Sequence, residues 1–155
     1  MLTFLHGTNA DSVARILVEG FSLDVARRSD SGDFGWGIYL TDAPSRARCY
    51  GAVVLSVEID DSRFARIKNP YFLEGLNEVQ PVTPEEKLFH GVAFRDGSML
   101  SVRASSDDER IVIARRIRKV FVEAGYAGII AGPDKRGQSE VVVFEVGAIG
   151  RVARS

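Results

Sequence analysis

Three features of the sequence carry side chains that could bind a small molecule and react with it. His6 follows an apolar opening run, Tyr39 ends a Gly-x-Gly-Ile-Tyr run, and Glu140 heads the β-prone run Glu-Val-Val-Val-Phe. Taken singly, they read as a strand-end histidine, a core aromatic and a solvated carboxylate, and Glu58 and Glu145 compete with Glu140. Together they offer a hydrogen-bonding ring, an aromatic face and a negative charge.

The composition limits the chemistry that these residues can support. Among 155 residues there is one cysteine, Cys49, and there are two histidines, His6 and His90, so neither an internal disulfide nor a closed zinc centre is expected. Twenty Lys and Arg against 21 Asp and Glu give a net charge of −1, which argues against a dedicated nucleic-acid binder. No apolar run approaches the roughly 18 to 20 residues of a membrane span, and the amino terminus does not resemble a signal peptide. We expect a metal-free cytoplasmic protein with a single domain over residues 1–155.

The hydrophobic pattern predicts an α+β fold with short strands and helices. Strands are expected at residues 2–6, 36–41, 53–59, 127–131 and 140–146. Helices are expected from Thr8 or Asn9 to Gly20, from an Asp42 cap to about Tyr50, near residues 84–89, and from Ser106 to Gly125. Residues 22–35 are expected to form a long loop, and residues 69–103 show no clear pattern.

The last predicted helix carries an apolar stripe, which consists of Ile113, Ile117, Val120, Phe121 and Ala124. Four basic residues lie largely off that stripe, where a solvated surface is favoured over a contact with an acceptor: Arg115, Arg116, Arg118 and Lys119. The same solvated interpretation applies to Arg63, Arg66 and Lys68.

Common catalytic and nucleotide-binding motifs are absent from the sequence. There is no Walker loop, serine elbow or His-Glu-x-x-His helix. The glycines at 32, 35 and 37 precede a strand and do not join a strand to a helix, so they are no dinucleotide fingerprint.

Two separate stretches do match the pattern of one family. Leu5-His6-Gly7-Thr8, then Phe34-Gly35-Trp36-Gly37-Ile38-Tyr39, then a tyrosine eleven residues further on, resemble the catalytic domain of poly(ADP-ribose) polymerase-like ADP-ribosyltransferases. Ser139-Glu140-Val-Val-Val-Phe is similar to the closing strand of that family, which begins with a glutamate. The resemblance covers roughly residues 2–59 and 107–149. It implies an ADP-ribosyltransferase fold, in which two packed, mostly antiparallel sheets flanked by helices form a split NAD-binding cleft.

The resemblance also implies a function. The protein would be an NAD-dependent mono-ADP-ribosyltransferase that cleaves the nicotinamide–ribose bond and transfers ADP-ribose to a macromolecular acceptor, a protein more readily than a nucleic acid. Glu140 would bond the 2′-hydroxyl of the nicotinamide ribose, beside the positive charge that develops on the sugar. His6 would bond the adenine-side ribose. Tyr39 and Tyr50 would stack on the nicotinamide ring.

Three further positions are implied to bind NAD, and two neighbours bear on the reaction. Gly7 would pair its backbone with the carboxamide, without a side chain in the way, and Thr8 stands beside it. Ala47 occupies the position of a serine that is common in the polymerase branch, and Arg46 that of a lysine. Gln138 resembles the acceptor-choosing residue of a Gln-x-Glu turn in related toxins, although a plain polar turn residue is the simpler interpretation.

Several alternatives stay open. Water could replace the acceptor, which would make the protein an NAD glycohydrolase, or the chain could be a non-catalytic module that binds NAD or ADP-ribose. RNA 2′-phosphotransfer ranks last, because it needs more histidines. Small free-standing relatives are toxins and effectors of bacteria or phages, so an antitoxin or immunity protein is a candidate partner, and no upstream regulatory domain is expected. Arg27 and Arg28 fall where the family keeps a loop over NAD.

Overall fold

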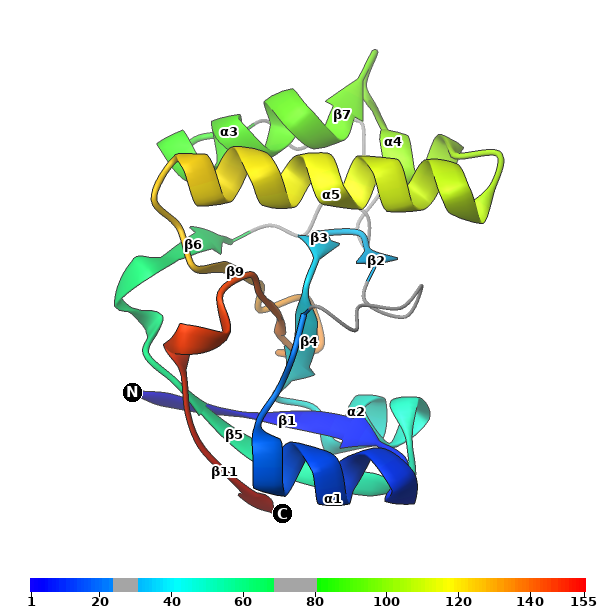
Figure 1. Ribbon diagram of the computed structural model, residues 1–155. Coiled ribbons are helices and arrows are strands. Elements are labelled where there is room, and N and C mark those ends of the chain that lie inside the picture. Colours follow the sequence, from blue (N-terminus) through cyan, green and yellow to red (C-terminus); the bar gives the residue numbers. More distant parts are fainter. Residues whose placement is uncertain (24–30, 69–80) are drawn as a thin grey trace.

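The computed structural model describes residues 1–23, 31–68 and 81–155, and it has the predicted α+β architecture (Figure 1). A mixed seven-stranded sheet forms its centre, in the order β11-β5-β1-β4-β10-β9-β6. Only β6 and β9 run parallel; the other neighbours are antiparallel. The strands are β1 (Leu2–Thr8), β4 (Ile38–Thr41), β5 (Val53–Ile59), β6 (Phe64–Ile67), β9 (Gly128–Ala131), β10 (Glu140–Val143) and β11 (Ile149–Arg154).

Five α-helices and two small hairpins surround this sheet in the described part of the chain. The helices are α1 (Ala10–Glu19), α2 (Pro44–Tyr50), α3 (Pro84–Ala93), α4 (Leu100–Arg103) and α5 (Asp107–Glu123). The hairpins pair β2 (Ser31–Gly32) with β3 (Gly35–Trp36), and β7 (Phe94–Arg95) with β8 (Ser98–Met99). Within the described ranges, no helix is long and apolar enough to cross a membrane.

The core consists of two apolar clusters, each of which includes residues of the central strands. One contains residues of α3 and α5, such as Phe89, Ile117 and Phe121, and Figure 1 shows these helices above the sheet. The other contains Val13 and Ile16 of α1, which lies below the sheet in the same view. Alternate residues of β4 and β10 contribute to the two clusters, so these short strands are covered on both sides.

The helix starts follow local sequence signals. The Asn9 side chain accepts a hydrogen bond from the backbone N–H of Ser12, and the Ser106 side chain accepts one from Glu109. Thr83 and Glu86 form a reciprocal capping box at the start of α3. Because these signals are local, the positions of α1 and α5 could be predicted from the sequence.

The structure corrects the prediction that Asp42 caps the second helix. Ala43 occupies the N-cap position, and no side chain caps α2. The Asp42 carboxylate instead accepts a hydrogen bond from the backbone N–H of Ser139, at 2.8 Å. Its partner lies 97 residues away in the sequence, so a local motif could not reveal it.

Strand boundaries also differ from the predictions. The predicted strand over 36–41 is divided at Gly37 into β3 and β4, and the predicted strand over 140–146 ends at Val143. β6 and β11 were not predicted. The resemblance implies two packed sheets, whereas the seven main strands here join into one. That join is narrow at its middle, because a single residue pair, Leu5 with Thr41, links β1 to β4, while β1 pairs with β5 at seven positions.

The solvated interpretation of four basic residues in α5 is corrected at one of them. Arg118 is only partly exposed, and it donates to the backbone carbonyl of Phe144. Arg115, Arg116 and Lys119 are exposed, as predicted. Arg115 and Arg118 also lie over the Trp36 ring, at 4.9 and 5.4 Å.

Other basic residues have different surroundings. Arg63 and Arg66 form ion pairs with Glu145 and Asp61, at 3.0 and 2.9 Å. Such surface pairs contribute little to stability. Arg27 and Arg28 lie outside the described residues.

Gly7 is required by the contact between β1 and α2. A Cβ atom on Gly7 would lie 1.7 Å from the carbonyl oxygen of Ala47, a distance that no real contact permits. The resemblance attributes this glycine to the approach of a ligand, but the packing of α2 alone already excludes a side chain here.

We predict that Gly7→Ala destabilises the fold by at least about 2 kcal/mol, because α2 has to move away from β1. Gly91→Ala in α3 is the control, since nothing lies within 4 Å of its added Cβ. That control should gain about 0.5 to 1 kcal/mol from its helical position. Urea denaturation measures both changes, and equal stability of Gly7→Ala and the wild type would refute the packing argument.

Candidate functional site

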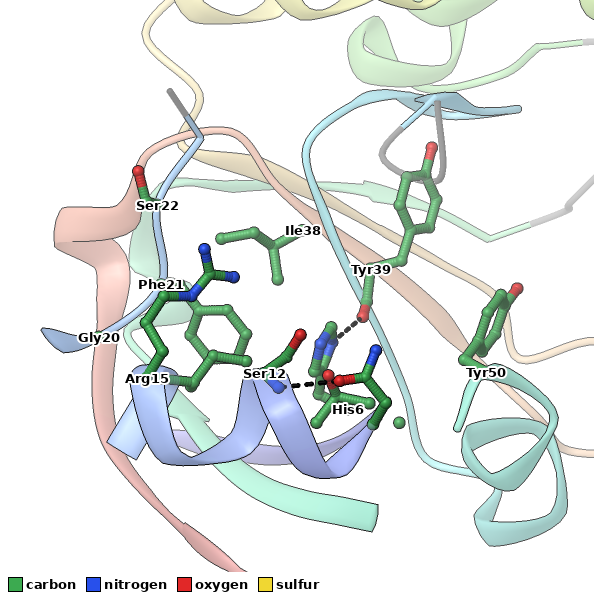
Figure 2. Close-up of a pocket in the computed structure, with 13 residues that line it drawn as sticks. His6, Ser12, Arg15, Gly20, Phe21, Ser22, Ile38, Tyr39 and Tyr50 are labelled. Carbon is green, nitrogen blue, oxygen red and sulfur yellow. Dashed lines mark hydrogen bonds between the residues drawn. The ribbon is translucent and has the colours of Figure 1, made fainter. Parts of the chain in front are cut away.

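The candidate site is a cavity of about 330 Å³ beside the narrow join of β1 and β4 (Figure 2). This volume lies at the lower end of the range of about 300 to 1,000 Å³ that is usual for ligand pockets. Thirteen residues line it: His6, Gly7, Thr8, Asn9, Ser12, Arg15, Ile16, Gly20, Phe21, Ser22, Ile38, Tyr39 and Tyr50. In Figure 2 the β4 ribbon passes between His6 and Phe21 on one side and the rings of Tyr39 and Tyr50 on the other.

His6 bridges the join between the two strands. Its Nδ1 lies 2.9 Å from the backbone carbonyl oxygen of Tyr39. A carbonyl oxygen can only accept, so Nδ1 carries the proton in this contact. The Phe21 ring meets the imidazole edge to face, with 4.9 Å between the ring centroids. These two contacts fix the plane of the imidazole at the wall of the cavity.

Tyr39 is one of the lining residues, and its side chain is held rigidly on the other side of β4 from His6. Its hydroxyl group donates to the backbone carbonyl of Gly35 at 2.6 Å and accepts from the backbone N–H of Phe34 at 3.2 Å. Gly32 makes room for the tip of the ring, because a Cβ there would lie 2.3 Å from Cζ of Tyr39. Burial, followed by the charge of Glu140, raises the pKa of Tyr39 well above its usual range, so the phenol stays protonated.

Tyr50 also lines the cavity, and it differs from Tyr39 in exposure. The residue ends α2, and 61% of its surface is exposed. Burial, together with the charge of Glu140, raises its pKa as well, while Arg46 opposes the rise. An exposed ring at the rim of a cavity can be covered by a flat ligand at little cost to the fold.

Glu140 is positioned by the register of the sheet. It pairs with Thr41 of β4, and Val142 pairs with Tyr39. Because every second residue of a strand shares a face, Glu140 and Tyr39 are diagonal neighbours on one face, about 7 to 8 Å apart in such ladders. The preceding residue, Ser139, accepts a hydrogen bond from the Thr41 hydroxyl group and donates its N–H to Asp42.

The surroundings of Glu140 disfavour its charge. Burial raises the pKa of this carboxyl from its ordinary 4.5 to about 6; Arg46 lowers it, and Asp33 adds to the rise. At neutral pH the group is therefore ionised in a largely dehydrated place. Electrostatic interactions are stronger there than in water, so the carboxylate can stabilise a positive charge that develops beside it.

The structure brings most of the predicted site residues together. His6, Gly7, Thr8, Tyr39 and Tyr50 line the cavity. Glu140 lies outside that lining, but its charge acts on both tyrosines.

Ala47 and Gln138 stand apart from the cavity lining. Ala47 is fully buried behind Gly7, so its side chain does not reach the cavity. The backbone N–H of Gln138 donates to the side chain of Asp134 in the turn before β10.

Sequence reasoning missed the side of the cavity that α1 provides. Asn9, Ser12, Arg15 and Ile16 line it from successive turns of this helix. Their spacing of three and four residues was visible in the sequence, but only as support for a helix. Asp42 and Ser139, which hold the start of β10, were missed because their contact is long-range.

A second cavity of about 440 Å³ contains none of the predicted site residues. It lies between α3 and α5 and is lined by Lys87, Leu88, Gly91, Val92, Phe94, Arg95, Leu100, Arg116 and Val120. In the described parts of the chain, no group of three His, Cys, Asp or Glu residues could hold a metal ion. The cavity beside His6 is therefore the better candidate site.

Comparison with known proteins finds a similarity among solved structures. No protein-family model matches the chain, and no curated protein matches it. Among solved structures, the chain is similar to one described as the crystal structure of an anti-CRISPR protein, with 16% sequence identity and a TM-score of 0.42. That match covers 99% of this chain and 95% of the other.

We predict that Glu140→Gln stabilises the protein at pH 8 and has no such effect below about pH 4. The carboxyl has a raised pKa in the folded state, so folding favours its protonated form and stability is lost as pH rises from 4.5 through about 6. This rise in pKa corresponds to about 2 kcal/mol at pH 8, which glutamine would recover.

Denaturation of both proteins between pH 4 and 8 measures this difference. Glu123→Gln, near the exposed end of α5, is the control for removal of one negative charge. Equal stability of Glu140→Gln and the wild type at pH 8 would mean that Glu140 is well solvated.

Proposed function

We propose that the protein is an NAD-dependent mono-ADP-ribosyltransferase. The observation that carries this proposal is the arrangement around β4, where Glu140 and Tyr39 share one face while His6 bonds the backbone of Tyr39 at the join. The resemblance of the sequence motifs assigns NAD-binding roles to these same residues. The narrow join of β1 and β4 supports the further proposal that the sheet is the split sheet of the ADP-ribosyltransferase fold.

The residues of the cavity fit NAD as a co-substrate. Tyr39, held by two hydrogen bonds, and Tyr50, with its exposed ring, would stack on the nicotinamide. Aromatic pairs of this kind contribute about 0.5 to 1.5 kcal/mol beyond the burial of area. Gly7 would offer its backbone to the carboxamide, and His6 would bond the adenosine ribose from the other side of β4. Thr8 lines the cavity beside Gly7. The backbone of Ala47 packs against Gly7 from behind.

Glu140 would supply the electrostatic part of the catalysis. In the transfer, the bond between ribose carbon and nicotinamide nitrogen breaks, and nicotinamide leaves with the electron pair. A nucleophilic atom of the acceptor then bonds to the ribose carbon and releases its proton. Positive charge develops on the sugar between these events, and an ionised carboxylate at the 2′-hydroxyl group stabilises it. This role requires Glu140 to be ionised, so activity should fall as pH drops below about 6.

The acceptor is proposed to be a macromolecule, a protein in preference to a nucleic acid. The net charge of −1 gives no general attraction to phosphates. A toxin or effector role, with an antitoxin or immunity protein as partner, is part of the proposal and rests on the resemblance to small free-standing family members.

We predict that Glu140→Gln lowers ADP-ribose transfer by about two to three powers of ten, the usual effect of losing one preorganised electrostatic contact. The affinity for NAD should change little, because the stacking and backbone contacts remain. Incubation with labelled NAD and cell lysate, followed by separation of protein from nucleic acid, measures the transfer, with Glu123→Gln as the matched control. Nicotinamide release without labelled acceptor would indicate a glycohydrolase, and intact NAD would refute both enzymatic functions.

We predict that Tyr50→Ala weakens nicotinamide binding by about two- to tenfold, because one stacking face is lost. The melting temperature should change little, since most of the residue is exposed. Tyr50→Phe keeps the ring and should bind nicotinamide as the wild type does. Titration of nicotinamide against the three proteins tests this expectation, and equal affinities would remove Tyr50 from the site.

A further inference from the structure

The side of the cavity that α1 forms contains a single fully charged residue, Arg15. None of the other twelve lining residues is an aspartate, glutamate, lysine or arginine. Arg15 follows Ser12 by three residues, so both project from the same side of α1. Figure 2 shows its guanidinium group reaching past the Phe21 ring toward Ile38.

Arg15 is not used by the fold in the part of the chain that the structure describes. It is exposed and has neither a hydrogen bond nor a salt bridge there, and neither Asp11 nor Glu19, one turn away on each side, pairs with it. The structural contacts of α1 come from Val13 and Ile16, which are buried. The guanidinium group is therefore available to a ligand.

The chemistry of the side chain points to a phosphate. Guanidinium presents planar donors that match the oxygens of phosphate and carboxylate, and the group stays charged at every physiological pH. The neighbouring wall offers Ser12 and Asn9 from the first turn of α1, where backbone N–H groups also favour anions. No carboxylate side chain in the cavity lining competes with a ligand phosphate for the guanidinium group of Arg15.

The position of Arg15 indicates which part of the dinucleotide it would contact. Arg15, Phe21 and His6 lie on one side of the β4 ribbon, and the rings of Tyr39 and Tyr50 lie on the other (Figure 2). If nicotinamide occupies the tyrosine side, the adenosine diphosphate half lies on the Arg15 side. The phosphates are the anionic groups of that half.

We infer that Arg15 binds a phosphate group of the dinucleotide, an inference that rests on the proposed function. The contact has two candidate sources. One is the bridging diphosphate, which every NAD-like ligand carries, and the other is a 2′-phosphate on the adenosine ribose, which NADP carries. The second source would let the site accept NADP as well as NAD.

The test compares Arg15→Gln with the wild type by calorimetric titration of ADP-ribose, 2′-phospho-ADP-ribose and adenosine. Glutamine keeps the helix propensity of the position. Arg151→Gln, at an exposed position in β11 away from the cavity lining, is the matched control. We expect Arg15→Gln to weaken binding of the phosphate-bearing ligand about tenfold to a hundredfold, the range for a lost charge-assisted contact. Adenosine binding and the Arg151→Gln variant should match the wild type.

The two phosphate sources give different results. A contact with the diphosphate weakens both ADP-ribose ligands by the same factor, whereas a contact with the 2′-phosphate weakens only 2′-phospho-ADP-ribose. In either case raised salt should weaken the wild type more than Arg15→Gln. Unchanged affinity for both ligands, or an equal loss for adenosine, would overturn the inference.

A kinetic measurement separates this inference from the proposed function. If the wild type transfers ADP-ribose and Arg15→Gln has the same KM for NAD and for NADP, the inference fails and the proposed function stands. If the wild type neither binds ADP-ribose nor cleaves NAD, the proposed function fails and the inference falls with it. A raised KM at unchanged kcat is the expected result.

Discussion

The register at Thr41 is the constraint on which the rest of the site depends. This buried residue pairs with Leu5 on one side and with Glu140 on the other, so one position of β4 aligns β1 and β10. The alternation of side chains then puts Tyr39 on the face of Glu140 and His6 on the opposite face. A slip of one residue between β4 and β10 would move Glu140 to the other face, away from the tyrosine ring.

The hydrogen bonds around Ser139 explain how a carboxylate can be held where burial opposes its charge. Ser139 is tied to Thr41 and Asp42, and the three residues after Glu140 are buried valines. A slip of β10 would therefore break side-chain hydrogen bonds and expose apolar surface together. These contacts oppose a slip and keep the strand in register, although burial disfavours the charge of Glu140.

Elements that depend on local sequence signals could be predicted from the sequence, whereas elements that depend on long-range contacts could not. The alternation in β5 and the caps at Asn9 and Ser106 are local, and these elements lie where they were expected. β6 is a strand because it pairs in parallel with β9, more than sixty residues later, and its short run carries no clear pattern. Motif matches named the residues of the predicted site, five of which line the cavity, whereas Arg15 belongs to no motif and becomes notable only beside the cavity.

The side chains of the two tyrosines lose their conformational freedom at different stages, and this difference bears on how a ligand would bind. Tyr39 is held by Gly35 and Phe34 before any ligand arrives, so its face is preorganised. Tyr50 is largely exposed at the end of a seven-residue helix, and its side chain loses freedom only on binding. A ligand would therefore gain most of its orientation from Tyr39, while Tyr50 would add coverage. In the proposed transferase, that coverage would shield the nicotinamide–ribose bond beside Glu140 from water. Its removal would favour attack by water over attack by an acceptor, so the ratio of hydrolysis to transfer would depend on Tyr50 more than on Tyr39.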